Sequence, residues 1–290
     1  MDNGDDLTKK TGDDFRFTTL PVINKRVMRL GMAGNYGLSS DDMRYAAEIG
    51  FNYWVWGASF RKVTPVLKEL CAKEREKHVI SYLAMAYTAG MVRRGVERTL
   101  RKLNTDYLDC YQLGWLGRTS RYSPAIIEMV ETLKDEGKIR SSGISIHDRV
   151  RAGELCKDSK LDLFMIRYNA KHPGAERDIF PHLNVRNPAV IAYTALSWRQ
   201  LIKPVKGITM PPWPGADADL AVPPLTPVLC YRFCLSSPHI HLTLTGPQNR
   251  EQLDGNIRAL EQGPISAEEM NWVRSYGEQV KAKKKLPYLP

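Results

Sequence analysis

The sequence predicts an α/β fold, a single (β/α)₈ TIM barrel with an N-terminal β-hairpin and an extra C-terminal helix. Two observations support this prediction. Short apolar segments alternate eight times with longer segments of helical periodicity along the 290 residues. The short segments are apolar almost throughout, which is typical of parallel strands buried on both faces. A closed barrel accommodates eight such units better than an open sheet does.

The expected elements follow one another along the chain. Strands are predicted at residues 27–32, 51–56, 78–84, 107–113, 139–145, 161–167, 189–193 and 240–245. Helices are predicted at residues 40–49, 63–76, 92–103, 124–136, 150–156, 175–183, 226–235, 249–262 and 266–281. The segment from residue 15 to just beyond 26 predicts a hairpin with Ile23-Asn24-Lys25 as its turn. The Pro- and Gly-rich segment 200–224 predicts a long loop over the barrel mouth.

Residues with known capping preferences mark several helix boundaries. Ser39 or Ser40, followed by aspartates, predicts the start of the first helix, and Asp148 predicts that of the fifth. Gly137 is typical of the residue after a helix C-terminus, and Ser266 before two glutamates is typical of an N-cap. The caps therefore support boundaries that hydrophobic periodicity alone defines loosely.

The chain is expected to form one domain over residues 15–290, after a polar and disordered leader at residues 1–14. No apolar run approaches the roughly 18 residues that span a bilayer. The cysteines are odd in number and scattered, which favours reduced thiols in the core over disulfides or a metal site. These cysteines are Cys71, Cys110, Cys156, Cys230 and Cys234. We therefore expect a cytoplasmic protein with no membrane partner and no metal.

The charge balance is basic, with 42 Lys and Arg against 32 Asp and Glu and a net charge of +10. Basic residues are concentrated at 93–102 and 281–285, and the first group alternates with apolar residues as on a solvated helix face. No nucleic-acid-binding motif accompanies them, so we expect no nucleic-acid partner. The positive charge favours an anionic small molecule, such as a phosphorylated cofactor. The oligomeric state stays open.

In a barrel of this kind, reactive groups come from the C-terminal strand ends and the loops that follow them. At these positions aromatic residues dominate, and acids and bases are scarce. The positions are Val55, Trp56, Phe60, Arg61, Tyr82, Leu83, Leu113, Gly114, Trp115, Ser145, Ile146, His147, Met165, Arg167, Tyr168, Asn169, Tyr193, Thr194, Thr245 and Gly246.

Several of these segments resemble the aldo-keto reductase family, in the family's order and over roughly residues 26 to 280. The matching segments are DYLDCYQL at 106–113, KIRSSGIS at 138–145, RYN at 167–169, AYTAL at 192–196, and the residues from 246 to 256. The resemblance implies reduction of carbonyl groups with NAD(P)H by a tetrad of Asp, Tyr, Lys and His. In that family the Tyr is the general acid, Lys and Asp lower its pKa, and His orients the substrate carbonyl.

All four tetrad positions depart from the family pattern. Val55 stands at the position of the Asp, Phe60 at that of the Tyr, Leu83 at that of the Lys and Gly114 at that of the His. None of these side chains can transfer a proton or lower the pKa of a neighbour.

A shifted alignment does not restore the tetrad, because the required residue types are missing from the whole region. The sequence has no Asp between residues 42 and 106, no Lys between 77 and 102, and no His between 78 and 147. Ordinary reduction of aldehydes and ketones is therefore expected to be absent or very weak.

The resemblance assigns only part of a cofactor site. Tyr193 matches the ring that stacks on the nicotinamide, and Ser145 matches a carboxamide contact, whereas Ile146 and Met165 replace two amide side chains. The remaining positions that match the cofactor-binding pattern are Thr194, Leu196, Gly246, Asn249, Arg250, Gln252 and Asn256. Arg250 is the candidate partner of a 2′-phosphate. The sequence leaves binding and non-binding of NADP(H) equally open.

The substrate pocket is expected to contain Trp56, Arg61, Tyr82 and Trp115, which suit an aromatic or anionic small molecule. Tyr82, His147 and Arg61 are weak catalytic candidates. For each, an ordinary structural role is the alternative, namely packing for the aromatic rings and a solvated loop for His147 and Arg61. Without a neighbouring Lys or Asp, the pKa of Tyr82 is expected to stay near the ordinary value of about 10.

Three functions remain open on the sequence alone. The favoured one is an atypical NADP(H)-linked oxidoreductase that uses another proton donor or none. The second is a catalytically inactive pseudoenzyme that senses a nucleotide or binds a partner. The third is a non-redox isomerase or lyase with its substrate in the aromatic mouth. The fold does not choose among them.

Overall fold

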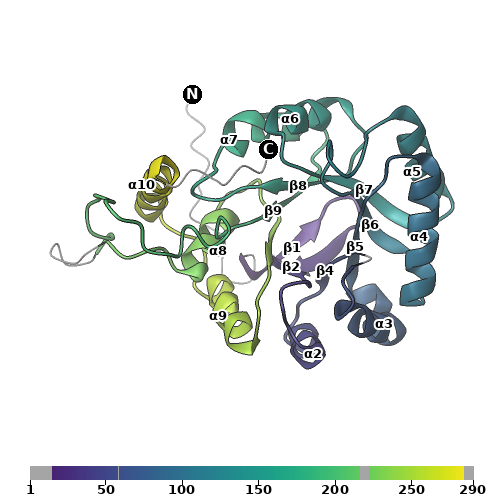
Figure 1. Cartoon of the computed structure of the whole chain (residues 1–290), viewed down its shortest axis with the longest axis horizontal. Helices are drawn as coiled ribbons and strands as arrows, with labels where there is room; N and C mark the ends of the chain where they lie inside the picture. Colours follow the sequence, from purple (N-terminus) through teal and green to yellow (C-terminus); the bar gives the residue numbers. More distant parts are fainter. Residues whose placement is uncertain (1–14, 58, 216–221, 284–290) are drawn as a thin grey trace.

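Eight parallel strands form a closed barrel (Figure 1), which confirms the predicted fold class. The computed structural model describes residues 15–57, 59–215 and 222–283. Each strand pairs with the next along the chain, and the last pairs with the first. The strands are β3 (Leu30–Ala33), β4 (Tyr53–Trp56), β5 (Val79–Ala84), β6 (Leu108–Leu113), β7 (Ile139–Ile146), β8 (Leu163–Arg167), β9 (Ala189–Tyr193) and β10 (Leu242–Thr245).

Helices surround the barrel and cover its outer face (Figure 1). They are α2 (Ser40–Glu48), α3 (Val63–Glu74), η1 (Arg75–Lys77), α4 (Ala89–Leu103), α5 (Pro124–Asp135), α6 (Arg149–Asp158), α7 (Ala175–Asp178), η2 (Phe180–Val185), α8 (Pro227–Leu235), α9 (Arg250–Glu261) and α10 (Ala267–Lys283). No helix in the described part of the chain is long and apolar enough to cross a membrane. All five cysteines are buried and free.

Several predicted boundaries are confirmed by their caps. The Ser39 and Asp148 side chains accept hydrogen bonds from the backbone N–H of the third residue of their helices, Asp42 and Arg151. Gly137, after α5, has a φ of 70°, which suits glycine at this position. Ser266 forms a capping box with Glu269, in which each side chain binds the backbone N–H of the other.

The predicted helix at 175–183 is wrong as one continuous element. It is divided into α7 and η2 at Ile179, whose φ of −124° is not helical. Pro181 stands in the first turn of η2. Because proline lacks an N–H group and clashes with the preceding turn, it is accepted at a helix start but not within one.

The predicted strand at 27–32 is also divided. The hairpin strand β2 (Lys25–Met28) ends at Met28 and the barrel strand β3 begins at Leu30. Arg29 lies between them, and its guanidinium donates to the backbone carbonyls of Leu235 and Ile240 at 2.8 and 2.7 Å. These bonds satisfy a buried charge at the point where the chain leaves the hairpin.

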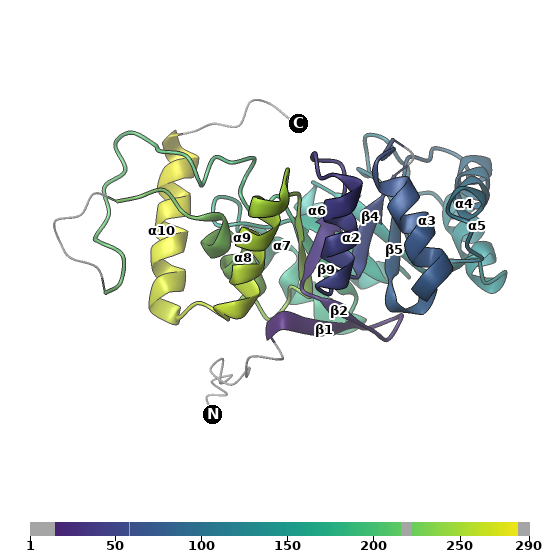
Figure 2. The same ribbon diagram turned by 90° about the horizontal axis from the view of Figure 1, so that it is seen from below.

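The hairpin of β1 (Phe17–Leu20) and β2 lies across the end of the barrel where the strands begin (Figure 2). Its turn is formed by residues 21–24, with Asn24 at a φ of 46°, and Lys25 already belongs to β2. Leu20 and Val27 pack against residues inside the barrel, including Val79. The hairpin therefore closes this end, and the open mouth lies at the other end.

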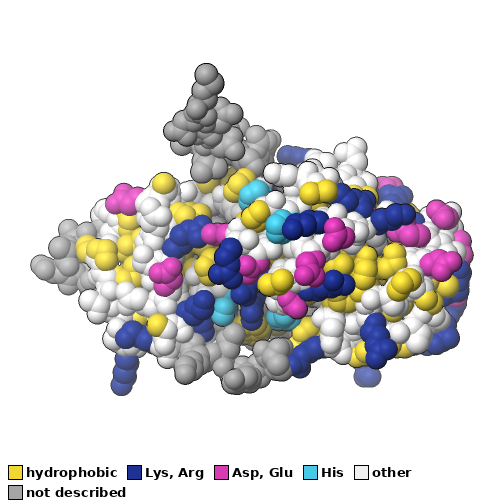
Figure 3. All heavy atoms as spheres, turned by 90° about the horizontal axis from the view of Figure 1, so that it is seen from above, with side chains coloured by type: hydrophobic (Ala, Val, Ile, Leu, Met, Phe, Trp, Pro, Cys, Tyr) yellow, Lys and Arg dark blue, Asp and Glu magenta, His cyan; other side chains and the backbone are white. Residues whose placement is uncertain are grey.

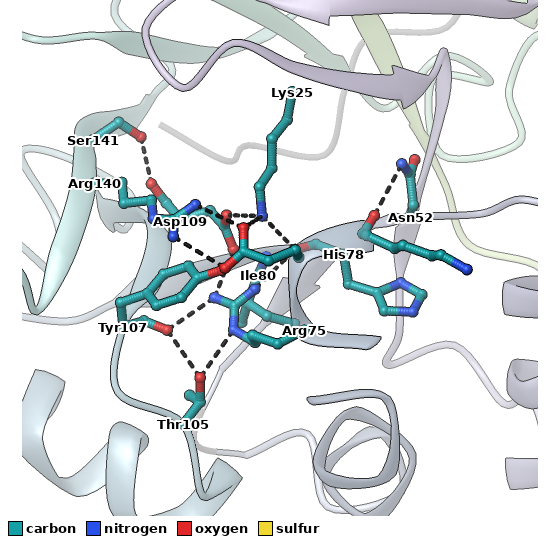
Figure 4. A network of polar contacts seen from close by, with 12 residues as sticks. Lys25, Asn52, Arg75, His78, Ile80, Thr105, Tyr107, Asp109, Arg140 and Ser141 are labelled. Atoms are coloured by element: carbon teal, nitrogen blue, oxygen red, sulfur yellow. Dashed lines mark hydrogen bonds and ion pairs between the residues drawn. The ribbon is translucent and has the colours of Figure 1, made fainter. Parts of the chain in front are cut away.

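Beneath the hairpin, the buried carboxylate of Asp109 organises a polar network (Figure 4). Its oxygens lie 3.0 Å from Lys25 Nζ and 2.8 Å from Arg75 Nη2, and one of them accepts a 2.8 Å bond from the N–H of Ile80. The Tyr107 ring lies between the guanidinium groups of Arg75 and Arg140, at 3.8 and 3.6 Å. This network joins β2, η1, β5 and β6, so it serves the fold at the closed end.

The segment 200–224 has no helix or strand in its described part, as predicted. Trp272 of α10 donates to the carbonyls of Pro211 and Pro212 at 2.9 and 3.0 Å. Gln279 of α10 bonds the backbone of Thr209. The described part of the loop therefore runs beside α10 at the side of the barrel (Figure 2), and the expected position over the mouth is wrong for these residues.

Strand side chains alternate between the inside of the barrel and the layer under the helices. On β4, Tyr53 and Val55 belong to an inner cluster that also contains Leu163 and Met165 of β8. Trp54, between the two β4 residues, belongs to the outer layer. Because the period is two, a shift of one residue decides whether a side chain can reach the mouth.

Candidate functional site

The four positions that match the tetrad lie together in one apolar half of the mouth. Val55 and Leu83 point into the barrel at the ends of β4 and β5, and Phe60 packs against the same inner cluster. Gly114 follows β6, and its N–H donates to the carbonyl of Ala84 at 2.6 Å. A hydrocarbon surface therefore lies where the resemblance places the proton relay.

The backbone at Gly114 leaves no room for a side chain. A Cβ atom built there would lie 2.8 Å from the carbonyl oxygen of Ala84 and 3.2 Å from Cγ of Leu83. The first contact is with backbone, which cannot turn aside as the end of a flexible side chain can. A larger residue at this position would require a shift of the β5 or β6 strand end.

Trp56 and Tyr82 lie under the helices, so their assignment to the mouth is corrected. Trp56 is 1% exposed, and its Nε1 donates to Thr64 Oγ1 of α3 at 3.1 Å. The ring centroids of Trp56 and Tyr82 are 5.4 Å apart, and the Tyr82 hydroxyl faces Gly95 of α4. Each of the two residues is next in sequence to an inward-pointing one, Val55 or Leu83, and therefore points outward. Burial also raises the pKa of Tyr82.

Polar side chains form the opposite half of the mouth. Leu163 and Met165 point inward on β8, so Arg167 at the end of this strand points toward the mouth. Arg167 pairs in register with Tyr193 at the end of β9, and the Tyr193 hydroxyl lies 3.0 Å from Nε2 of His147, just beyond β7. We call His147, Arg167 and Tyr193 the polar arc.

Burial and positive charge set the ionisation of the polar arc. Burial, and then the charges of Arg167 and Arg118, lower the pKa of His147 to about 4. Burial raises the pKa of Tyr193 and lowers that of Arg167. At neutral pH the arc therefore holds a neutral imidazole, a protonated phenol and a guanidinium cation.

Trp115 adjoins the polar arc. Its ring centroid lies 5.6 Å from that of His147, and the Arg118 guanidinium lies 5.4 Å from its centroid. Trp115 has a φ of 47°, uncommon for a residue other than glycine. This loop conformation brings the indole against the imidazole.

Arg61, the sequence-based candidate for an anion contact, lies in an exposed turn after β4. Its N–H donates to the Ser59 carbonyl at 2.9 Å. Its exposure is compatible with either a solvated role or a contact with a ligand at the rim, so the predicted role stays a prediction.

The positions that match the nicotinamide contacts differ in what they offer. Ser145 is 7% exposed and lies on β7 opposite Met165 of β8. Thr194 follows Tyr193 with a φ of 57°, and its carbonyl accepts a 2.8 Å bond from Asn169 Nδ2. Leu196 packs against the outer core. The turn after β9 is thus fixed by Asn169.

The positions that match the adenine contacts surround the start of α9. Asn249 caps the helix through the N–H of Gln252, and Gln252 in turn accepts from the N–H of Gln248. Asn256 donates to Thr245 Oγ1 at 2.8 Å. A side chain at Gly246 would clash with the Tyr36 ring at 2.5 Å.

Arg250 lies at the rim of this region. Its Nε lies 2.9 Å from Asp42 Oδ1, and its guanidinium stacks 3.6 Å from the centroid of Tyr45. The Arg250 side chain is 43% exposed. These contacts hold the guanidinium in place and leave part of it open to an anion.

A hollow of about 560 Å³ lies at the closed end of the barrel, between the hairpin and the starts of β4 and β5. Lys25 and Glu76 on its wall pair at 3.4 Å, and Glu74 pairs with Lys77. These charges neutralise one another within the fold, so the hollow offers less to a ligand than the mouth does.

The face that α6 and α7 cover also mixes basic and acidic side chains and has no single basic patch (Figure 3).

Sequence reasoning identified His147 and Tyr193 separately and missed their pairing, and it placed Arg167 at the mouth without giving it a role. The signal was present in part: 163, 165 and 167 are successive inward positions of one strand. The three residues come together because of the register between β7, β8 and β9, and this register cannot be read from the sequence.

The model of the aldo/keto reductase family matches residues 30–201 of the chain. The methylglyoxal reductase YeaE of Escherichia coli (strain K12) is 31% identical over 137 residues, which are 46% of this chain and 48% of that protein. The uncharacterized oxidoreductase YqkF of Bacillus subtilis (strain 168) is 26% identical over 213 residues, 65% of this chain and 66% of YqkF. The chain thus matches about half of the length of the first relative.

Solved structures share the fold. The holo form of aldo-keto reductase AKR11C1 from Bacillus halodurans is similar with a TM-score of 0.74 and 21% identity, over 90% of this chain and 96% of that one. An aldo-keto reductase from Klebsiella pneumoniae, solved in complex with NADPH, gives a TM-score of 0.70 and 21% identity, over 91% and 97% of the two chains. At about 21% identity, these similarities show a shared fold.

Proposed function

Because the chain belongs to the aldo/keto reductase family, we propose that it is an NADP(H)-linked oxidoreductase that works without the family's usual proton relay. Its substrate has a reacting bond that is already polarised or conjugated, and so accepts a hydride without a strong acid beside it. The observation that carries the proposal is the apolar half of the mouth, where Val55, Phe60 and Leu83 pack together.

Residues at both ends of a cofactor site fit NADP(H) in part. Ser145 offers a hydroxyl and Tyr193 a ring for the nicotinamide, while the N-terminus of α9 and the half-exposed Arg250 suit a 2′-phosphate. Met165 fits less well, because a thioether cannot replace the hydrogen bonds of an amide. When bound, NADPH would supply the hydride.

The polar arc sets what proton chemistry this chain can provide. Burial raises the pKa of Tyr193 despite the opposing charge of Arg167, so its hydroxyl is a poor acid. His147, with a pKa of about 4, is neutral at pH 7. A positioned general acid contributes roughly 10²- to 10⁴-fold to a rate. We therefore expect unactivated aldehydes and ketones to react slowly by about this factor.

The relatives support a substrate with an activated carbonyl. Two proteins of Escherichia coli (strain K12) that match this chain are named methylglyoxal reductases. Methylglyoxal is an aldehyde whose carbonyl is activated by the adjacent ketone. It therefore belongs to the substrate class that a mouth with a weak acid can reduce.

The test is a titration of the full chain with NADPH, followed by tryptophan fluorescence, and then a comparison of substrates. We expect NADPH binding, and faster oxidation of NADPH with methylglyoxal or cinnamaldehyde than with propanal. Tyr193→Phe keeps the ring and removes the hydroxyl, so it should retain binding.

Two results would contradict the proposal: no binding of NADPH at millimolar concentration, or turnover of propanal as fast as that of methylglyoxal. Binding of NADPH without turnover of any substrate would instead favour a nucleotide-sensing protein, because such a protein needs no catalytic groups at its mouth.

A further inference from the structure

Arg167 is held at the mouth without a counter-ion among the described residues. It lies partly buried at the end of β8, and its guanidinium forms neither an ion pair nor a hydrogen bond with another described side chain. The carboxylate of Asp178 is already engaged by Arg149 at 2.9 Å and by Arg177 at 2.7 Å. An unpaired, partly desolvated cation costs free energy, which binding of an anion would offset.

The positive charge of Arg167 acts on two nearby histidines. The pKa of His172 is lowered to about 3, first by burial and then by Arg167, Lys171, Lys281 and Arg149. The same cation lowers the pKa of His147 on the other side. Both imidazoles are therefore neutral at pH 7, so neither competes with an anion for the positive potential of Arg167.

The surroundings of Arg167 suit a planar anion attached to an apolar body. His147 and Tyr193 bond each other at 3.0 Å and flank the guanidinium, so they limit the space beside it. Trp115 extends this wall with a flat ring. The apolar half of the mouth then offers hydrocarbon contact to the rest of the molecule.

We propose that Arg167 binds the carboxylate of the substrate, and that the apolar body of this substrate packs over Val55, Phe60 and Leu83. A guanidinium matches a carboxylate through two parallel N–H···O bonds, which also fixes the orientation of the substrate. This inference rests on the proposed function, because it concerns the substrate of the same mouth. It names the substrate class as unsaturated or oxo carboxylic acids with an apolar body.

The experiment measures binding of trans-cinnamate to the full chain without cofactor, by tryptophan fluorescence and calorimetry, with trans-cinnamamide as the neutral analogue. Arg167→Met removes the charge and keeps the length of the side chain, whereas Arg167→Lys keeps the charge and removes the fork. Arg258→Met is the matched control, because it removes an exposed cation near the C-terminal end of α9, outside the residues assigned to the mouth.

We expect Arg167→Met to weaken cinnamate binding by at least about tenfold, the usual effect of losing a charged hydrogen bond. Arg167→Lys should give a smaller loss. Cinnamate binding by Arg258→Met and cinnamamide binding by Arg167→Met should each change less than about twofold. The melting temperature of Arg167→Met should not fall, because the removed charge has no structural partner among the described residues.

Equal binding of cinnamate and cinnamamide would overturn the inference, and so would a loss of cinnamate binding in Arg258→Met as large as that in Arg167→Met. Inorganic phosphate that competes as tightly as cinnamate would show a general oxyanion site and would overturn the assignment to a carboxylate. Weaker NADPH binding in Arg167→Met would assign the residue to the cofactor instead. Because cinnamate is tested without cofactor, failure of NADPH to bind contradicts the proposed function alone.

Discussion

The Tyr193 hydroxyl and Nε2 of His147 lie 3.0 Å apart on one side of the mouth, beyond the ends of β9 and β7. The two rings meet edge to face at 84°, with their centroids 5.5 Å apart. Since burial holds His147 neutral and Tyr193 protonated, the hydrogen bond needs no charge on either partner. In the neutral imidazole either partner can donate, since the Tyr193 hydroxyl both gives and accepts hydrogen bonds and the tautomer decides which role Nε2 takes.

This pairing predicts a pH dependence of stability. The pKa of His147 is about 4 in the folded chain against an ordinary value of about 6.5, so the unfolded chain binds more protons between these values. Stability from this group is present above about pH 6.5 and is lost as the pH falls toward 4. For a partly exposed ring we expect a loss of about 1–2 kcal/mol.

The measurement is urea unfolding at pH 7 and pH 5 for the unaltered chain and for His147→Gln. The glutamine keeps a polar atom near Tyr193 and does not titrate, so its loss of stability between the two pH values should be smaller. The other buried histidines titrate in both proteins and cancel in the comparison. An identical pH dependence in the two would show that His147 titrates normally.

Arg250 should distinguish NADPH from NADH. It is 43% exposed and fixed by Asp42 and Tyr45, so it is oriented before a 2′-phosphate arrives. We expect Arg250→Met to weaken NADPH binding by about tenfold, the effect of losing one charge-assisted contact, and to leave NADH binding unchanged. Arg258→Met, an exposed arginine near the other end of the same helix, should affect neither nucleotide.

The carboxylate of Asp109 should matter for folding and not for ligands. It is fully buried and is paired with Lys25 and Arg75 beneath the hairpin (Figure 4). Asp109→Asn leaves these two cations without their carboxylate, which typically costs about 3–5 kcal/mol. Asp106→Asn, an exposed position three residues earlier, should change the free energy of unfolding by less than about 0.5 kcal/mol. Equal stability of the two variants in urea would show that the network contributes little.

The sequence was sufficient for the barrel because apolar periodicity and capping residues report on local structure. It misplaced Trp56 and Tyr82 because they lie near the ends of their strands, although alternate side chains of a strand point to opposite faces and Val55 and Leu83 hold the inward positions. It missed the polar arc for a different reason. His147, Arg167 and Tyr193 are distant in sequence, and only the register of three strands brings them together.

Gly114 should not accept a side chain, and this limits any attempt to restore the family's relay. The contact of 2.8 Å between a Cβ at Gly114 and the Ala84 carbonyl oxygen implies that Gly114→Ala must displace the backbone. We expect a cost of about 1–3 kcal/mol, the range of other overpacking substitutions. Gly255→Ala is the control, because nothing lies within 4 Å of a Cβ there and the residue is inside α9.

Gly255→Ala should stabilise the chain by about 0.5–1 kcal/mol, since alanine favours a helix over glycine. The two substitutions add the same methyl group. Changes of opposite sign in the free energy of unfolding, measured in urea, would therefore show the effect of the space around each residue. If Gly114→Ala were as stable as the unaltered chain, the strand ends at β5 and β6 would be able to separate. A histidine at this position could then be accommodated, and the steric obstacle to a relay at this position would be removed.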